Sequence, residues 1–224
     1  NSTSSFKVDV DWRPFAFSSE GEVADAPVVY AGYGVVAPAG EGQKAIDHYA
    51  GLDVQDRWVL VFRHVPMNLS PESRQHLHRY SSLRYKAMVA RDRGARGILV
   101  VSGPNSQVRS ELAPLRFDVS LAGTSIAAIS ISDALAGKLL RGSGKSLGDL
   151  QDLADSASES RGFELPGAEV SSNIVLVHQR RTGRNVIGRL QVGPEPSGDF
   201  ILIGAHVDHL GRGDNSSSLA GESE

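Results

Sequence analysis

Apolar residues recur along this chain with two spacings, one typical of strands and one typical of helices. The segment 6–17 alternates apolar and other residues, which predicts a strand with one buried face. Gly32 and Gly34 interrupt a later apolar run and indicate a bulge or a closely packed neighbour. Continuous apolar runs predict further, more deeply buried strands. They lie at 28–37 (VVYAGYGVVA), 58–65 (WVLVFRHV), 97–102 (GILVVS) and 125–132 (SIAAISIS).

The segment 81–93 (SSLRYKAMVARDR) has the spacing of an amphipathic helix. Leu83, Ala87 and Ala90 fall on one face, and Met88 lies beside them. The helix and the residues after it are basic, and a solvated surface is the simplest interpretation. A surface for a substrate carboxylate or a partner is the alternative. The basic residues are Arg84, Lys86, Arg91, Arg93 and Arg96.

Two shorter helices are predicted near the middle of the chain. One spans 133–141, with Ser132 as its N-cap, and the other spans about 146–156. The stretch between the 58–65 strand and the basic helix, HVPMNLSPESRQHLHRY, is interpreted as an exposed loop. Within it, His76 and His78 could bind a metal adventitiously, but no third ligand is suitably spaced.

A polar stretch at 155–167 is the best candidate for a domain boundary. Three strands are predicted after it, over 173–180, 185–192 and 200–206. The last of them, FILIGAH, is apolar on both faces, as a central strand covered by helices would be. No covering helix follows, so we expect the natural continuation or another chain to supply the missing layer.

Composition narrows the partners and the possible metal chemistry. The 224 residues carry a net charge of −3 and no long basic run, which argues against nucleic acid or an anionic membrane as the main partner. No apolar stretch is long enough to span a bilayer, and the first residues lack a signal-peptide pattern. Cysteine is absent, so any metal must be held by histidine and carboxylate side chains.

One candidate metal ligand stands at the end of the last predicted strand. His206 could give one ring nitrogen to a metal, while Asp208 accepts a hydrogen bond from the other nitrogen and fixes the tautomer. A hydrogen-bonded pair at a strand end is the plainer alternative, because His-x-Asp is a weak pattern. His209 and Asp214 lie nearby without a defined role.

The sequence around this pair, NVIGRLQVGPEPSGDFILIGAHVDHLG (185–211), closely resembles the start of the catalytic domain of di-zinc aminopeptidases. That family includes secreted bacterial and vacuolar aminopeptidases and the glutamate carboxypeptidases. The resemblance implies that His206 is the first zinc ligand and that Asp208 is the catalytic carboxylate that orients it. It also implies two zinc ions, a bridging Asp and a Glu-Glu pair, and none of these acidic residues is found before Glu224. We therefore expect the chain to be inactive alone.

The upstream sequence resembles the protease-associated domain that is often built into such peptidases. The resemblance rests on GYGVVAP at 32–38, on the segments 47–66 and 81–104, and on SIAAISISDALAGKLL at 125–140. It implies a mixed α/β chain: a strand segment at 1–22, a protease-associated sandwich or barrel with flanking helices at 23–165, and the first strands of the zinc peptidase domain at 166–224.

The resemblance implies that the chain is part of a secreted or periplasmic zinc aminopeptidase. Its substrate would be a peptide or protein, and the remainder of the peptidase domain would be needed to cover the last strands. A non-catalytic protease-associated module that binds or presents peptides is the alternative.

Overall fold

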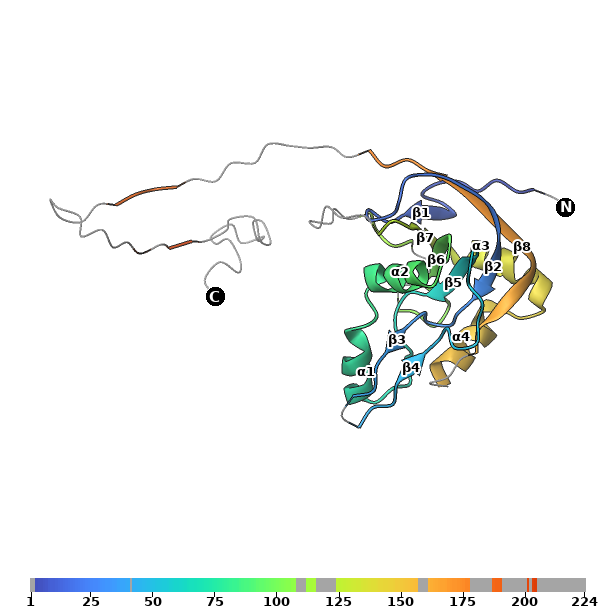
Figure 1. Cartoon of the computed structure of the whole chain (residues 1–224), viewed down its shortest axis with the longest axis horizontal. Coiled ribbons are helices and arrows are strands. Elements are labelled where there is room, and N and C mark those ends of the chain that lie inside the picture. The colour runs from blue at the N-terminus through green and yellow to red at the C-terminus, as the bar shows by residue number, and fades with distance from the viewer. Residues whose placement is uncertain are drawn as a thin grey trace. The chain divides into compact units, whose positions relative to one another are not determined.

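A curled six-stranded sheet forms the centre of the first part of the chain (Figure 1). The computed structural model describes residues 3–40, 42–107, 112–115, 124–156, 161–177, 187–190, 201 and 203–204. Contacts group residues 1–178 into one body and residues 179–224 into a second. The first body holds all the helices and strands of the described residues. They are β1 (Trp12–Pro14), β2 (Gly21–Tyr30), β3 (Val36–Ala37), β4 (Ile46–Asp47), β5 (Trp58–Phe62), α1 (Pro71–His78), α2 (Leu83–Asp92), β6 (Gly97–Val101), β7 (Ala127–Ile131), α3 (Asp133–Leu139), the 3-10 helix η1 (Leu140–Ser143), α4 (Leu147–Ser156) and β8 (Phe163–Ile174).

The large sheet has the order β1-β7-β6-β5-β2-β8. Strands β2, β5, β6 and β7 run parallel, while β1 and β8 are antiparallel to their neighbours at the two edges. Every residue of β5, β6 and β7 is buried, as expected for parallel strands covered on both faces. Because β2, β5, β6 and β7 run parallel, their carboxyl ends meet at one edge of the sheet. The short strands β3 and β4 form a separate two-stranded sheet.

Helices cover both faces of the parallel strands. Along β5, Trp58, Leu60 and Phe62 pack into one apolar cluster, which includes residues of α1, α3 and α4. Val59 and Val61 point the other way, into a second cluster with residues of α2. Alternate side chains of one strand thus anchor two helical layers. The predicted mixed α/β class is confirmed.

Two glycines let a large side chain pack closely against the backbone. Gly34 has a φ of +60°, and a Cβ there would lie 2.6 Å from a Val61 methyl carbon. A Cβ at Gly97 would lie 2.1 Å from the ring of Trp58. The expectation of a closely packed neighbour at Gly34 is confirmed, although the glycine lies in the turn between β2 and β3 rather than inside a strand.

The outer strand β8 pairs with β2 in a register that shifts twice along its length. The shifts lie between Val23 and Ala26 and between Pro27 and Val29 of β2. In the middle of β8, Pro166 is exposed and is followed by Gly167, whose φ is +71°. The pairing reaches from Gly21 to Tyr30, so β8 remains attached to the first body despite these irregularities.

The segment interpreted as an exposed loop contains helix α1, so that prediction was wrong. Ser70 caps the helix by accepting a hydrogen bond from the Ser73 backbone N–H at 3.2 Å, and Pro71 follows at the first helical position. Leu77 is the buried residue of this helix. One buried residue gives no visible apolar period, whereas the Ser-Pro cap is readable in the sequence.

One other prediction needed correction. The strand expected over 6–17 is reduced to β1; before it, Arg13 pairs with Asp9 at 2.6 Å, and Val8 and Val10 are exposed. In α2, Ala87 and Ala90 are buried and Leu83 is partly buried, as the predicted apolar face requires, and Met88 beside them is 38% exposed.

The third buried residue of α2 is Lys86, which the sequence interpretation had placed among the basic residues of a solvated surface. Its side chain is fully buried. The physical reason is a set of backbone acceptors that only the folded chain brings together.

The second body contributes residues 187–190, 201 and 203–204 to the described part, and none of them lies in a strand. Ile201 and Ile203 are 91% and 90% exposed. The strands predicted over 185–192 and 200–206 are therefore not formed at these positions. An apolar strand without a paired neighbour or a covering layer is not stable in water.

The expected domain boundary at 165/166 falls inside β8, whereas the contacts divide the chain at 178/179. Among the described residues, no helix has the length and apolar character that crossing a membrane requires.

Candidate functional site

The chain leaves β5 at the carboxyl edge of the sheet as Arg63-His64-Val65, and this segment is held by Lys86 of α2. The Lys86 Nζ donates hydrogen bonds to the carbonyl oxygens of Phe62, Arg63 and His64, at 2.8, 3.1 and 2.6 Å. An ammonium has three donors, so all are used by three consecutive carbonyls. Burial lowers the pKa of Lys86 well below its usual value.

A surface hollow lies beside this segment, between the end of β5, the end of α1 and the start of α2. We call it the basic groove. It has a volume of about 270 Å³ and is lined by Arg63, His64, Val65, His78, Ser81, Ser82 and Leu83. The described lining contains two histidines and an arginine but no carboxylate.

The electrostatics of the basic groove are positive. The pKa of His64 is lowered, first by partial burial and then by the positive charges of Arg63 and Lys86 and by His78. These neighbours oppose protonation of the ring, so the neutral form of His64 is favoured, and the positive charge of the groove lining comes from Arg63.

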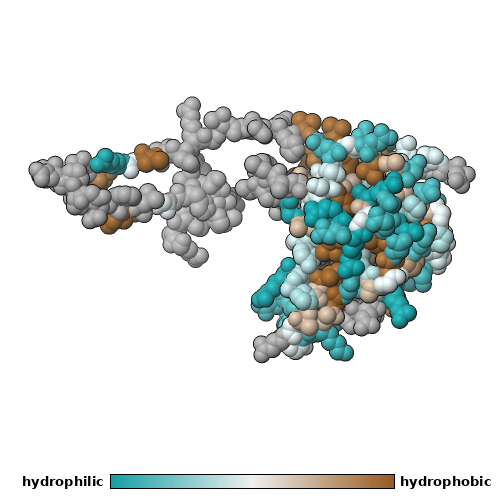
Figure 2. Space-filling view, in the orientation of Figure 1, coloured by the Kyte–Doolittle hydropathy of each residue, from teal (hydrophilic) through white to brown (hydrophobic). Residues whose placement is uncertain are grey.

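A second hollow of about 470 Å³ adjoins the basic groove at His78. It is lined by Leu69, Pro71, Arg74, Gln75 and His78, and we call it the apolar shelf because Leu69 and Pro71 are in its lining. Arg74 is held in place by donating from Nη2 to the Met67 carbonyl oxygen at 2.6 Å. Figure 2 shows hydrophilic residues over the outer side of α1.

The loop after β5 is also held by a buried carboxylate, that of Asp155. Asp155 of α4 accepts hydrogen bonds from the Tyr33 hydroxyl at 2.6 Å and from the Met67 backbone N–H at 2.9 Å. Its second oxygen accepts from the Asn105 side-chain amide at 3.2 Å. Burial, together with the bond to Asp155, raises the pKa of Tyr33, so the hydroxyl remains a donor. The loop after β5 is therefore tied to both α2 and α4.

The histidines of the first body have separate environments. His48 is buried, and its Nδ1 accepts from the Val35 backbone N–H at 3.0 Å; burial lowers its pKa to about 4. His76 lies 2.9 Å from the Pro38 carbonyl oxygen, whereas His78 lines the basic groove. Residues two apart on a helix do not face each other. The structure therefore separates His76 and His78, which do not form a shared metal site.

The predicted metal residues His206 and Asp208 lie outside the described residues, as do His209 and Asp214. Within the described part of the chain, no group of three or more histidine or acidic side chains could hold a metal ion. The zinc assignment accordingly stays a prediction. The sequence interpretation did not anticipate the basic groove, because none of the basic residues that it assigned to a surface (Arg84, Lys86, Arg91, Arg93 and Arg96) lines it.

Comparisons with known proteins show distant similarity to solved structures. No sequence profile of a known protein family matches the chain, and no curated protein matches it. Among solved structures, an aminopeptidase from Aneurinibacillus sp. strain AM-1 is similar, with 22% identity and a TM-score of 0.36. The similarity covers 60% of this chain and 26% of that protein, so the chain spans about a quarter of its length.

Proposed function

We propose that this chain is part of an extracytoplasmic zinc-dependent aminopeptidase, containing a protease-associated domain followed by the first residues of the catalytic domain. The observation that carries the proposal is the octapeptide Gly-Ala-His-Val-Asp-His-Leu-Gly at 204–211, directly after the apolar run 200–203. The upstream resemblance over 32–140 supports it, as does the separate body formed by residues 1–178.

In this proposal His206 binds one zinc ion, and Asp208 holds the other ring nitrogen so that the correct tautomer faces the metal. Two zinc ions, when bound, supply an activated water and polarise the scissile carbonyl. A catalytic zinc usually needs three protein ligands, and this chain supplies His206 with its orienting carboxylate. We therefore expect the 224-residue chain to lack peptidase activity.

The test compares the full-length gene product with the 224-residue chain. The full-length product is expected to contain two zinc ions per chain and to hydrolyse aminoacyl-nitroanilides. His206→Ala should abolish activity and lower the zinc content, while His209→Ala should retain most of both. A full-length product without further acidic and histidine residues able to complete the centre would refute the proposal. Micromolar one-to-one zinc binding at His206 in the 224-residue chain would also contradict it.

A second function is favoured by a different observation. The basic groove and the apolar shelf are formed by residues of the first body alone, whereas the proposed zinc ligand His206 belongs to the second body. A module that binds peptides without cleaving them would need only these surfaces. Peptide binding by the 224-residue chain without zinc, together with an inactive full-length product, would select this function.

A further inference from the structure

The charges of the basic groove are not neutralised within the described part of the chain. No ion pair or hydrogen bond there engages the guanidinium of Arg63 or the rings of His64 and His78. Other arginines of the same body pair with carboxylates at the surface; these are Arg13, Arg57, Arg91, Arg93 and Arg96. Arg63 has no such partner among the described residues and is half-buried against a hollow whose described lining contains no carboxylate.

Arg63 and His64 are carried on a fixed backbone. Their carbonyl oxygens are both bound by Lys86, so this backbone cannot move without breaking partly buried hydrogen bonds. The same loop is held at Met67 by Asp155. A binding group supported in this way loses little conformational entropy when a ligand arrives.

The N-terminus of α2 adds a smaller positive potential to the basic groove. Ser82 caps this helix by accepting from the Tyr85 N–H at 3.2 Å, and both Ser82 and Leu83 line the basic groove. The first turn of α2 has no acidic residue, so its partial positive charge is not compensated there. Ser81 lines the same groove, and its hydroxyl donates to the His78 carbonyl oxygen at 3.1 Å.

We propose that the basic groove binds a carboxylate of an acidic peptide, and that an adjacent apolar side chain of the peptide rests on the apolar shelf. Charge complementarity selects the carboxylate, because Arg63 offers a planar fork of donors that matches its two oxygens. His78 borders both hollows, so a peptide lying across it contacts the cations on one side and Leu69 and Pro71 on the other. This inference deepens the proposed function, since it rests on a peptide as the ligand.

The test uses the 224-residue chain without zinc and fluorescein-labelled pentapeptides in an anisotropy titration at low salt. One peptide places leucine beside two glutamates, and its control replaces both glutamates with glutamines. The acidic peptide is expected to bind at least about tenfold more tightly than its control, because only its glutamates carry the negative charge that the basic groove attracts. Its affinity should fall with added salt, because the groove is open to solvent.

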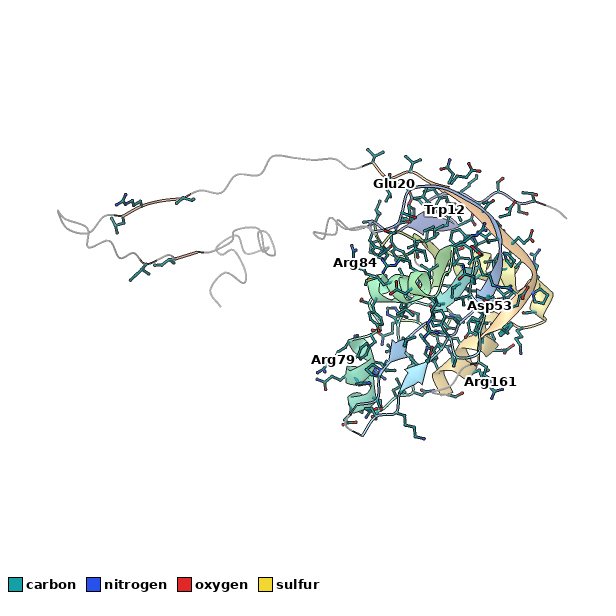
Figure 3. All side chains as sticks on the ribbon, in the orientation of Figure 1. Trp12, Glu20, Asp53, Arg79, Arg84 and Arg161 are labelled. Atoms are coloured by element: carbon teal, nitrogen blue, oxygen red, sulfur yellow. The ribbon has the colours of Figure 1, made fainter. Side chains whose placement is uncertain are left out.

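Two variants test the location, and one provides a matched control. Arg63→Gln and His78→Asn are each expected to weaken binding of the acidic peptide several-fold. Arg79→Gln, at an exposed position next to α1 that Figure 3 labels, should leave binding unchanged. Unchanged thermal unfolding of each variant ensures that a loss of binding reports on the groove rather than on folding.

Three outcomes would overturn the inference: equal affinity for the two peptides, equal losses in Arg79→Gln and Arg63→Gln, or binding of inorganic phosphate without binding of the acidic peptide. The phosphate titration separates a general anion site from a peptide site. None of these outcomes bears on zinc content or peptidase activity in the full-length product. Failure of this inference is therefore distinguishable from failure of the proposed function.

Discussion

The Lys86 Nζ lies 2.6 Å from the carbonyl oxygen of His64, although the two residues are 22 positions apart in the sequence. This contact joins the second turn of α2 to the chain leaving β5. It is one of three hydrogen bonds from the same ammonium. A single buried side chain thus fixes the part of the backbone that carries Arg63 and His64.

Replacing Lys86 with methionine should destabilise the first body substantially. The apolar length of the side chain is kept, but three carbonyls lose their donor in a buried position. We expect the free energy of unfolding to fall by about 2–4 kcal/mol. Urea unfolding followed by circular dichroism measures this change. Lys44→Met, at an exposed position, should shift stability by less than about 0.5 kcal/mol; an equally small shift at Lys86 would mean that the three bonds contribute little.

Tyr33 and Asp155 should be energetically coupled. Tyr33→Phe removes the donor to a buried carboxylate and should cost about 1–2 kcal/mol. Asp155→Asn keeps an oxygen acceptor but removes the charge. The double variant should lose less stability than the sum of the two single losses, with a coupling of about 1 kcal/mol for groups in direct contact. Strict additivity in the unfolding free energies would show that the 2.6 Å contact is not a significant interaction.

His48 should make stability depend on pH below neutrality. Its folded-state pKa of about 4 lies below the unfolded value of about 6.5, so the unfolded chain binds the proton more tightly. Stability is therefore fully present above pH 6.5 and is lost as pH falls toward 4. The difference corresponds to about 3 kcal/mol.

The measurement is urea unfolding at a series of pH values between 7 and 4. His48→Gln should flatten the dependence by most of that amount, whereas Lys44→Met should retain it. A His48→Gln variant with the full pH dependence would show that other groups are responsible. His64, whose pKa is also lowered, should contribute in the same direction.

Gly34 and Gly51 form a matched pair for measuring packing. Both have positive φ angles, +60° and +72°, so alanine is strained at either position. Only at Gly34 would the new Cβ meet a neighbour, Val61, at 2.6 Å, while nothing lies within 4 Å of the Cβ at Gly51. Gly51→Ala should lower the free energy of unfolding by about 1 kcal/mol, because alanine is strained in the left-handed conformation.

Gly34→Ala should cost about 1–3 kcal/mol more, because the core around Val61 is already filled. Thermal unfolding of the two variants gives the difference directly. Equal losses would mean that Val61 moves aside without penalty.

Local sequence patterns were sufficient for β5, β6 and β7 and for three of the four α-helices of the described residues, whereas the run predicted as one strand over 28–37 is divided between the end of β2 and β3, and most of β8 was not predicted. The apolar runs of β5, β6 and β7 are too long and too uniform to be loops, and Ser132 caps α3 as predicted. Helix α1 was missed because it buries one residue, Leu77, and so shows no apolar period. The cap at Ser70 and Pro71 was the available signal.

The candidate site was harder to predict, because its parts come from distant segments. The burial of Lys86 depends on three carbonyls that precede it by 22 to 24 positions. No rule of composition or periodicity marks a lysine for such a role, and by spacing alone it belongs with its exposed neighbours. The zinc prediction concerns His206 and Asp208, which lie outside the described residues. It is tested by the zinc content of the full-length product and of its His206→Ala variant.

The irregular outer strand has a consequence for how copies of this protein behave in solution. A long, flat β8 would offer its unpaired amides and carbonyls as a template for a strand of another molecule. Pro166 lacks an amide hydrogen, and the left-handed Gly167 bends the strand at the same place. The exposed carboxylate of Glu169 would repel a second acidic edge. The open side of the sheet is therefore protected against edge-to-edge aggregation.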